Sequence, residues 1–108
     1  MSATSANKPY VLPQNVISPQ RYMRVIEILI DGGEEGACSY ALQLWTEEDK
    51  HSIGVRWNGD GEKPNGTPNI SGHACWLVLD EMLWPAVLAA VKDTAKRARA
   101  TKLLYSGA

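Results

Sequence analysis

Four side chains could act as soft metal ligands or as members of a nucleophilic pair: Cys38, His51, His73 and Cys75. Zinc sites place Cys and His at recurring short spacings, and only His73 and Cys75 lie close together along this chain. These two side chains would share one face of a strand, but a histidine at the entrance of a strand is more often an ordinary hydrogen-bonding residue. We therefore predict no metal site and no cofactor.

Sequence motifs for covalent or phosphate chemistry are absent. The chain has no nucleophile elbow, no P-loop and no dinucleotide-binding glycine pattern. Residues 58–62 alternate glycine with acidic residues, but they lack the ligand spacing of a calcium loop, so we predict a polar turn. A Cys–His or Ser–His pair can still form from residues that are distant in sequence. The sequence supports no enzymatic activity, and we expect a protein that is not an enzyme.

The length and composition indicate one small domain. The chain has 108 residues, of which 44% are hydrophobic, and its net charge is −1. Residues 1–50 carry four basic and seven acidic side chains, whereas residues 51–108 carry seven basic and five acidic ones. Neither a signal peptide nor a membrane-spanning run is visible, so we expect a cytoplasmic protein with reduced thiols and no membrane partner.

Hydrophobic periodicity divides the chain into a tail and a domain. Residues 1–20 contain three prolines and no regular period, so we predict a flexible N-terminal tail, followed by one domain over residues 21–106. Alternating or continuous apolar runs predict four strands, at 22–30, 37–45, 51–58 and 73–79. The glycine-rich connection before the last of them is long, as functional loops often are.

A helix is predicted after the last strand. Asp80 fits an N-cap, apolar residues then recur at helical spacing through Val91, and the helix is expected to run on to about residue 104. Pro85 is expected to bend this helix or to displace its start. The predicted fold is therefore α+β, with a four-stranded antiparallel sheet followed by one long C-terminal helix that covers one face.

Two segments resemble the PC4-like transcriptional coactivator family. The stretch Val55-Arg56-Trp57-Asn58-Gly59 is similar to the strand-to-loop segment of its bacterial members. The stretch from Leu77 to Val87 is similar to the family's last strand and helix start, with the capping residue at Asp80 and the tryptophan at Trp84. The acidic residues beside the first two strands and the proline at position 85 depart from the family pattern.

The resemblance implies a cytoplasmic homodimer that binds single-stranded DNA or RNA in transcription, without sequence specificity. Aromatic side chains would stack on bases, and basic ones would neutralise phosphates. The predicted nucleic-acid-binding residues are Arg24, Trp45, Lys50, Arg56, Trp57 and Lys63. The predicted dimer interface lies on the helix, because one helix on a small sheet would leave an apolar stripe uncovered. Its residues are Leu83, Trp84, Val87, Leu88 and Val91.

Alternatives accompany these assignments. Trp57 alternates with apolar residues and is as compatible with the core as with the surface. Lys92, Lys96 and Arg99 form a basic stripe on the predicted helix, which could contact phosphates or a protein partner or be a solvated face. The near-neutral charge favours a second hypothesis, a small adaptor or inhibitor that binds a protein through its sheet edge or its helix, with no nucleic-acid or catalytic activity.

Overall fold

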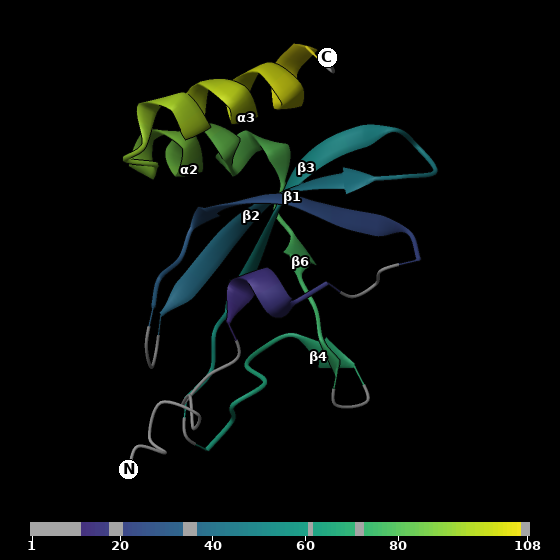
Figure 1. Cartoon of the computed structure of the whole chain (residues 1–108), viewed down its shortest axis with the longest axis vertical. Coiled ribbons are helices and arrows are strands. Elements are labelled where there is room, and N and C mark those ends of the chain that lie inside the picture. Colours follow the sequence, from purple (N-terminus) through teal and green to yellow (C-terminus); the bar gives the residue numbers. More distant parts are fainter. Residues whose placement is uncertain (1–11, 18–20, 34–36, 61, 71–72, 107–108) are drawn as a thin grey trace.

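The three longest strands coincide with three of the segments predicted from alternating or continuous apolar runs. The computed structural model describes residues 12–17, 21–33, 37–60, 62–70 and 73–106. Strands β1 (Met23–Ile30), β2 (Cys38–Trp45) and β3 (Lys50–Trp57) pair antiparallel in chain order. A short strand, β6 (Leu77–Val78), adds to β3 and gives the sheet order β1-β2-β3-β6 (Figure 1). The predicted α+β class and four-stranded antiparallel sheet are confirmed.

The register of β2 and β3 separates the two faces of the sheet. Leu42 lies opposite Ile53, and both side chains are buried in the core beneath the helices. Ala41 and Gln43 alternate with Leu42 and point to the other face. Gly54 pairs with Ala41 on that face, where a β-carbon would collide with the side chain of Gln43. The sheet therefore has two covered faces, and each needs its own covering layer.

The fourth predicted strand is interrupted. Residues 73–79 contain β5 (His73–Ala74), which pairs with β4 (Asn69–Ile70) in a separate two-stranded sheet, and then β6. Between them, the Trp76 side chain is buried in the second core, and its Nε1 donates to the carbonyl of Val16 at 2.7 Å. The apolar run is therefore not one continuous strand, because Trp76 packs under the sheet instead of continuing the β3 ladder.

The predicted single helix is divided. A 3-10 turn, η2 (Glu81–Leu83), precedes α2 (Trp84–Ala90) and α3 (Thr94–Ser106). Asp80 is the predicted cap, accepting from the Met82 amide at 2.9 Å, and Pro85 lies in the first turn of α2. Val91 takes an extended conformation, and Asp93 then accepts from the Lys96 amide at 3.0 Å at the start of α3. No helix in the described part of the chain is both long and apolar enough to cross a membrane.

Each face of the sheet has its own core. The helices cover the first face, on which Leu42 and Ile53 pack against residues of α2 and α3 (Figure 1). The second face is covered by residues 12–17, which include the 3-10 turn η1 (Pro13–Asn15), and by Trp76. Val16 is buried there beside Met23. Part of the predicted tail is thus packed on the sheet, while residues 1–11 and 18–20 lie outside the described residues.

Candidate functional site

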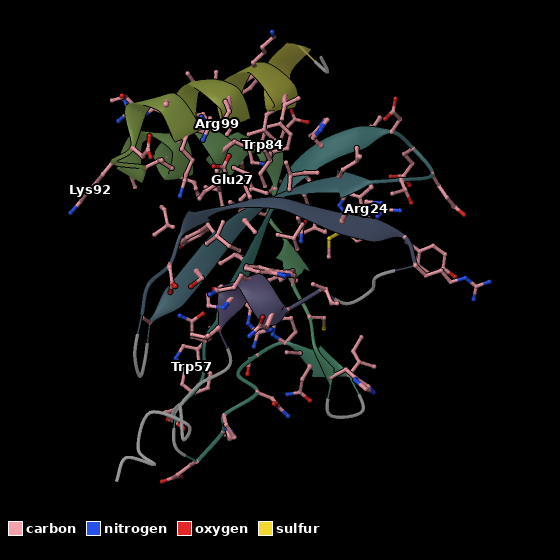
Figure 2. The ribbon with its side chains drawn as sticks, in the orientation of Figure 1. Arg24, Glu27, Trp57, Trp84, Lys92 and Arg99 are labelled. Carbon is pink, nitrogen blue, oxygen red and sulfur yellow. The ribbon has the colours of Figure 1, made fainter. Side chains whose placement is uncertain are left out.

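The predicted nucleic-acid-binding residues lie at separate places on the sheet. Trp45 and Lys50 are opposite one another at one end of the β2–β3 ladder, and Trp57 lies at the other end. At about 3.3 Å per residue, the eight-residue strands separate these ends by about 23 Å. Arg24 pairs with Leu44, so it points to the opposite face from Trp45, and it lies far from Trp57 (Figure 2). The structure places Trp45 and Lys50 side by side at one end of the ladder, away from Trp57.

Trp57 and Lys63 belong to the region of the long loop. The Trp57 side chain is half-buried, and its amide donates to the carbonyl of Thr67 at 2.9 Å. The side chain of Lys63 is exposed, while its carbonyl accepts from the amides of Asp60 and Gly66 at 3.1 and 3.0 Å. The backbone of this loop is therefore ordered by its own hydrogen bonds and by its bridge to the end of β3.

Arg56 has an internal role that excludes the predicted phosphate contact. Only 2% of the residue is exposed, and its guanidinium donates to the carbonyls of Asn65, Pro68 and Cys75. Burial lowers the pKa of Arg56 from its ordinary value. Gly66 gives it room, since a β-carbon at that position would collide with the guanidinium. Arg56 therefore fastens the 62–69 loop and the 73–76 segment to β3, and its assignment to the nucleic-acid-binding set is wrong.

The predicted dimer interface is largely the core of the domain itself. Trp84, Val87, Leu88 and Val91 are buried against the sheet, and only Leu83, at 48% exposed, lies on the surface. The sheet needs the whole apolar stripe of α2, so little of that stripe is left for a second copy. The prediction is thus corrected for these four residues. The exposed positions of α3 are mostly polar, charged or small: Thr94, Ala95, Ala98, Arg99, Thr101, Lys102 and Tyr105.

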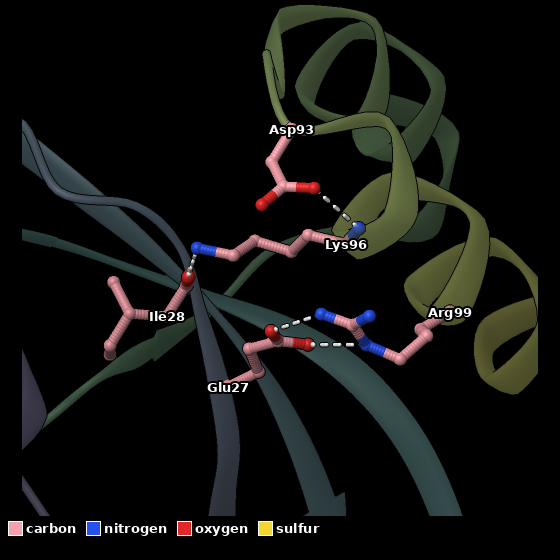
Figure 3. A network of polar contacts seen from close by, with 5 residues as sticks. All are labelled: Glu27, Ile28, Asp93, Lys96 and Arg99. Atoms are coloured by element: carbon pink, nitrogen blue, oxygen red, sulfur yellow. Dashed lines mark hydrogen bonds and ion pairs between the residues drawn. The ribbon is translucent and has the colours of Figure 1, made fainter.

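Two side chains of the predicted basic stripe, and the neighbouring Arg97, make contacts within the domain. Lys96 Nζ donates to the carbonyl of Ile28 at 2.8 Å, and Arg99 Nη2 lies 2.8 Å from Glu27 Oε2 (Figure 3). Arg97 donates through Nε and Nη2 to the carbonyl of Val91, where α2 ends. Lys96 and Arg99 therefore join α3 to β1, and Arg97 closes the end of α2, while Lys92 is exposed.

The outer edge of β1 borders a groove. β1 ends the sheet, and no other described strand pairs with its outer side. The groove has a volume of about 560 Å³ and lies where β1 meets the N-terminal segment. Its lining residues are Gln14, Ile17, Met23, Arg24, Val25, Ile26, Glu27 and Ile28. Sequence reasoning did not identify this site, because period-two alternation does not reveal which strand lies at the edge of a sheet.

The groove combines apolar side chains with the arginine Arg24. Ile17 and Ile26 are 45% and 43% exposed. The register shift between Val25 and Glu27 places Ile26 in an irregularity of the β1–β2 ladder. Arg24 is exposed and has no ion-pair partner among the described residues. An edge strand with this lining can hold an extended chain by main-chain hydrogen bonds and accept alternate side chains on its apolar surface.

A second hollow surrounds the Trp45–Lys50 pair. It has a volume of about 310 Å³ and is lined by Trp45, Glu48, Lys50, His51, Ser52, Val78, Glu81 and Trp84. Both indole N–H groups are engaged within the domain, since Trp45 Nε1 donates to Ser52 Oγ at 2.8 Å and Trp84 Nε1 donates to the carbonyl of Leu79 at 3.3 Å. The two glutamates oppose the binding of phosphate. Across the described ranges, no three His, Cys, Asp or Glu side chains gather to hold a metal ion.

Comparison of the chain with family profiles, curated protein sequences and solved structures finds no match.

Proposed function

We propose that this domain is a protein-binding adaptor that accepts an extended polypeptide segment along the outer edge of β1. The observation that supports the proposal best is the 560 Å³ groove beside a strand that has no described partner on its outer side. An added strand gains affinity from main-chain hydrogen bonds, and the side chains that face the groove provide selectivity. The exposed Ile17 and Ile26 side chains offer apolar surface to such a segment.

The charges near the groove indicate the chemistry of the bound segment. The charged residues that line the groove are Arg24 and Glu27, and the Glu27 carboxylate is already paired with Arg99. We therefore propose a segment with apolar side chains at alternate positions and a carboxylate that reaches Arg24. A charged pair of this kind at an exposed rim contributes to orientation and association rate more than to affinity.

The test uses a synthetic peptide and two matched lysine substitutions. The peptide is capped at both ends, alternates valine with threonine, carries one glutamate, and has N-methylated amides along one edge to prevent self-pairing. Binding is followed by titration of the isotope-labelled protein in NMR spectra. Ile26→Lys places a charge in the groove, whereas Leu77→Lys places one at an exposed position on β6 at the opposite edge.

The expected result is a shift of the β1 amide signals, with binding lost in Ile26→Lys and retained in Leu77→Lys. Both substituted side chains are exposed, so both variants should keep the fold, which circular dichroism checks. Equal affinity for the wild type and the two variants, or signal changes confined to the rest of the domain, would rule out the β1 edge as the site.

A second proposal keeps single-stranded nucleic acid as the ligand. It is favoured by the cross-strand pairing of Trp45 with Lys50 beside the smaller hollow. A base stacked on a tryptophan contributes about 1–3 kcal/mol. In this case an oligonucleotide quenches tryptophan fluorescence at low salt, and Lys50→Met reduces the salt dependence by about one phosphate contact. Unchanged fluorescence at low salt would eliminate this proposal and leave the adaptor function unaffected.

A further inference from the structure

Two side chains of α3 reach over the second half of the β1 edge. The Lys96 ammonium donates to the main-chain carbonyl of Ile28 at 2.8 Å. Next to it, Arg99 pairs with Glu27 through Nη2 and Oε2 at 2.8 Å and through Nε and Oε1 at 3.4 Å (Figure 3). The Asp93 cap orients the start of α3, since it accepts from the Lys96 amide at 3.0 Å. One end of the β1 edge is therefore occupied by contacts from the helix.

The first half of the same strand has no such cover in the described part of the chain. Among residues 23–26, Arg24 and Ile26 are exposed, and α3 makes no recorded hydrogen bond to them. The boundary between the halves coincides with the register shift between Val25 and Glu27. Lysine side chains and bulges are devices that limit pairing on an exposed edge strand. Here they divide the edge into an open part, residues 23–26, and a part contacted by α3 at Glu27 and Ile28.

We infer that Lys96 sets the register of the bound segment by occupying the Ile28 carbonyl, so that an added strand pairs with residues 23–26 and stops before Ile28. This inference rests on the proposed strand addition and specifies which part of the edge takes part. A segment that extends to Ile28 must displace the ammonium from its acceptor. The ligand is therefore a short extended segment, whose acidic side chain meets Arg24 in the open part.

The experiment compares the wild type with Lys96→Met and Lys92→Met, using the same capped valine–threonine peptide. Methionine keeps an unbranched apolar side chain at position 96 and removes the donor. Lys92 is exposed in the connection between α2 and α3, so its substitution makes an equal change of charge. Hydrogen exchange of individual β1 amides, read by NMR, reports the extent of pairing, and titration gives the affinity.

In the wild type and in Lys92→Met, the peptide should slow exchange within residues 23–26 only. In Lys96→Met, protection should extend to residues 28–30, with binding about two- to tenfold tighter, the effect of one further hydrogen bond. If protection and affinity are identical in all three proteins, the inferred role of Lys96 is wrong, whereas the strand-addition function is not affected. Absence of peptide binding in all three overturns the strand-addition function together with the role of Lys96.

Discussion

Replacement of Arg56 by methionine should destabilise the domain strongly, because this buried guanidinium joins three segments. It donates to carbonyls of the 62–69 loop and of the 73–76 segment from its position on β3. Methionine fills part of the same volume but donates no hydrogen bond. The substitution therefore removes the donor from these carbonyls at a position where Arg56 is only 2% exposed.

The magnitude follows from the number of hydrogen bonds that are lost. The Pro68 carbonyl keeps a bond from the Cys75 amide at 3.1 Å, so the cost falls mainly on the carbonyls of Asn65 and Cys75. Two bonds from a charged donor contribute about 3–6 kcal/mol. Relief from burying the guanidinium offsets part of this loss, so we expect Arg56→Met to lower the free energy of unfolding by about 2–4 kcal/mol.

Urea denaturation followed by tryptophan fluorescence measures this change, with Arg24→Met as the control. Arg24 is exposed, so its substitution should change the free energy of unfolding by less than about 0.5 kcal/mol. Arg56→Lys should fall between the two, since one ammonium cannot reproduce the planar fork of a guanidinium. A free energy of unfolding for Arg56→Met within about 1 kcal/mol of the wild type would refute the argument from lost hydrogen bonds.

Three further substitutions or conditions test other parts of the fold. Leu88→Ala should lower the free energy of unfolding by about 2–5 kcal/mol, because it leaves a cavity in the core. The denaturation midpoint of the wild type should not vary with protein concentration, and a midpoint that rises with concentration would restore the predicted dimer interface. Trp76→Phe should cost about 1 kcal/mol, because it removes the donor to the Val16 carbonyl, and stability equal to the wild type would contradict the packing of residues 12–17. Asp93 accepts from the Lys96 amide, and this hydrogen bond holds the pKa of the Asp93 carboxyl below its ordinary value. The cap therefore stabilises α3 at pH values above the unfolded-state pKa, and this stabilisation is lost as the pH falls through the folded-state pKa. NMR signals of residues 94–106 should report the change.

The strands and the first cap were predictable from local chemistry. An apolar run placed β1, and alternation of apolar residues placed β2 and β3, each to within one residue at each end. Asp80 and Pro85 were recognised from their positions before the apolar helical period, and both lie at the starts of their elements. Such features depend on residues that are near one another in sequence.

The break in the helix and the composition of the cores depend on tertiary contacts. Apolar residues continue at helical spacing through Val91, so the sequence predicted one helix; in the structure Val91 is extended and Asp93 caps α3. Trp84 and Leu88 were assigned to a dimer interface, because the sequence does not show how many apolar side chains of the helix pack against the sheet of the same domain. The sequence indicates a solvated strand residue at Arg56, because the carbonyls that its guanidinium contacts belong to segments that are distant along the chain.

The candidate site was the least predictable part. The groove joins β1 to Gln14 and Ile17, which the sequence assigned to a tail because their segment has no regular period. Of the six predicted nucleic-acid-binding residues, only Arg24 lines this groove. An edge position arises from strand order, and strand order is fixed by contacts between distant segments.

The most direct measurement of strand addition is an isotope-filtered NMR experiment on the labelled wild-type protein with the unlabelled valine–threonine peptide. It detects nuclear Overhauser effects between peptide protons and individual protein amides. Strand addition at β1 predicts effects from the peptide backbone to the amides of residues 23–26, with the peptide glutamate close to Arg24. Effects to β6 or to the 62–69 loop, or none in a complex that forms, would contradict it.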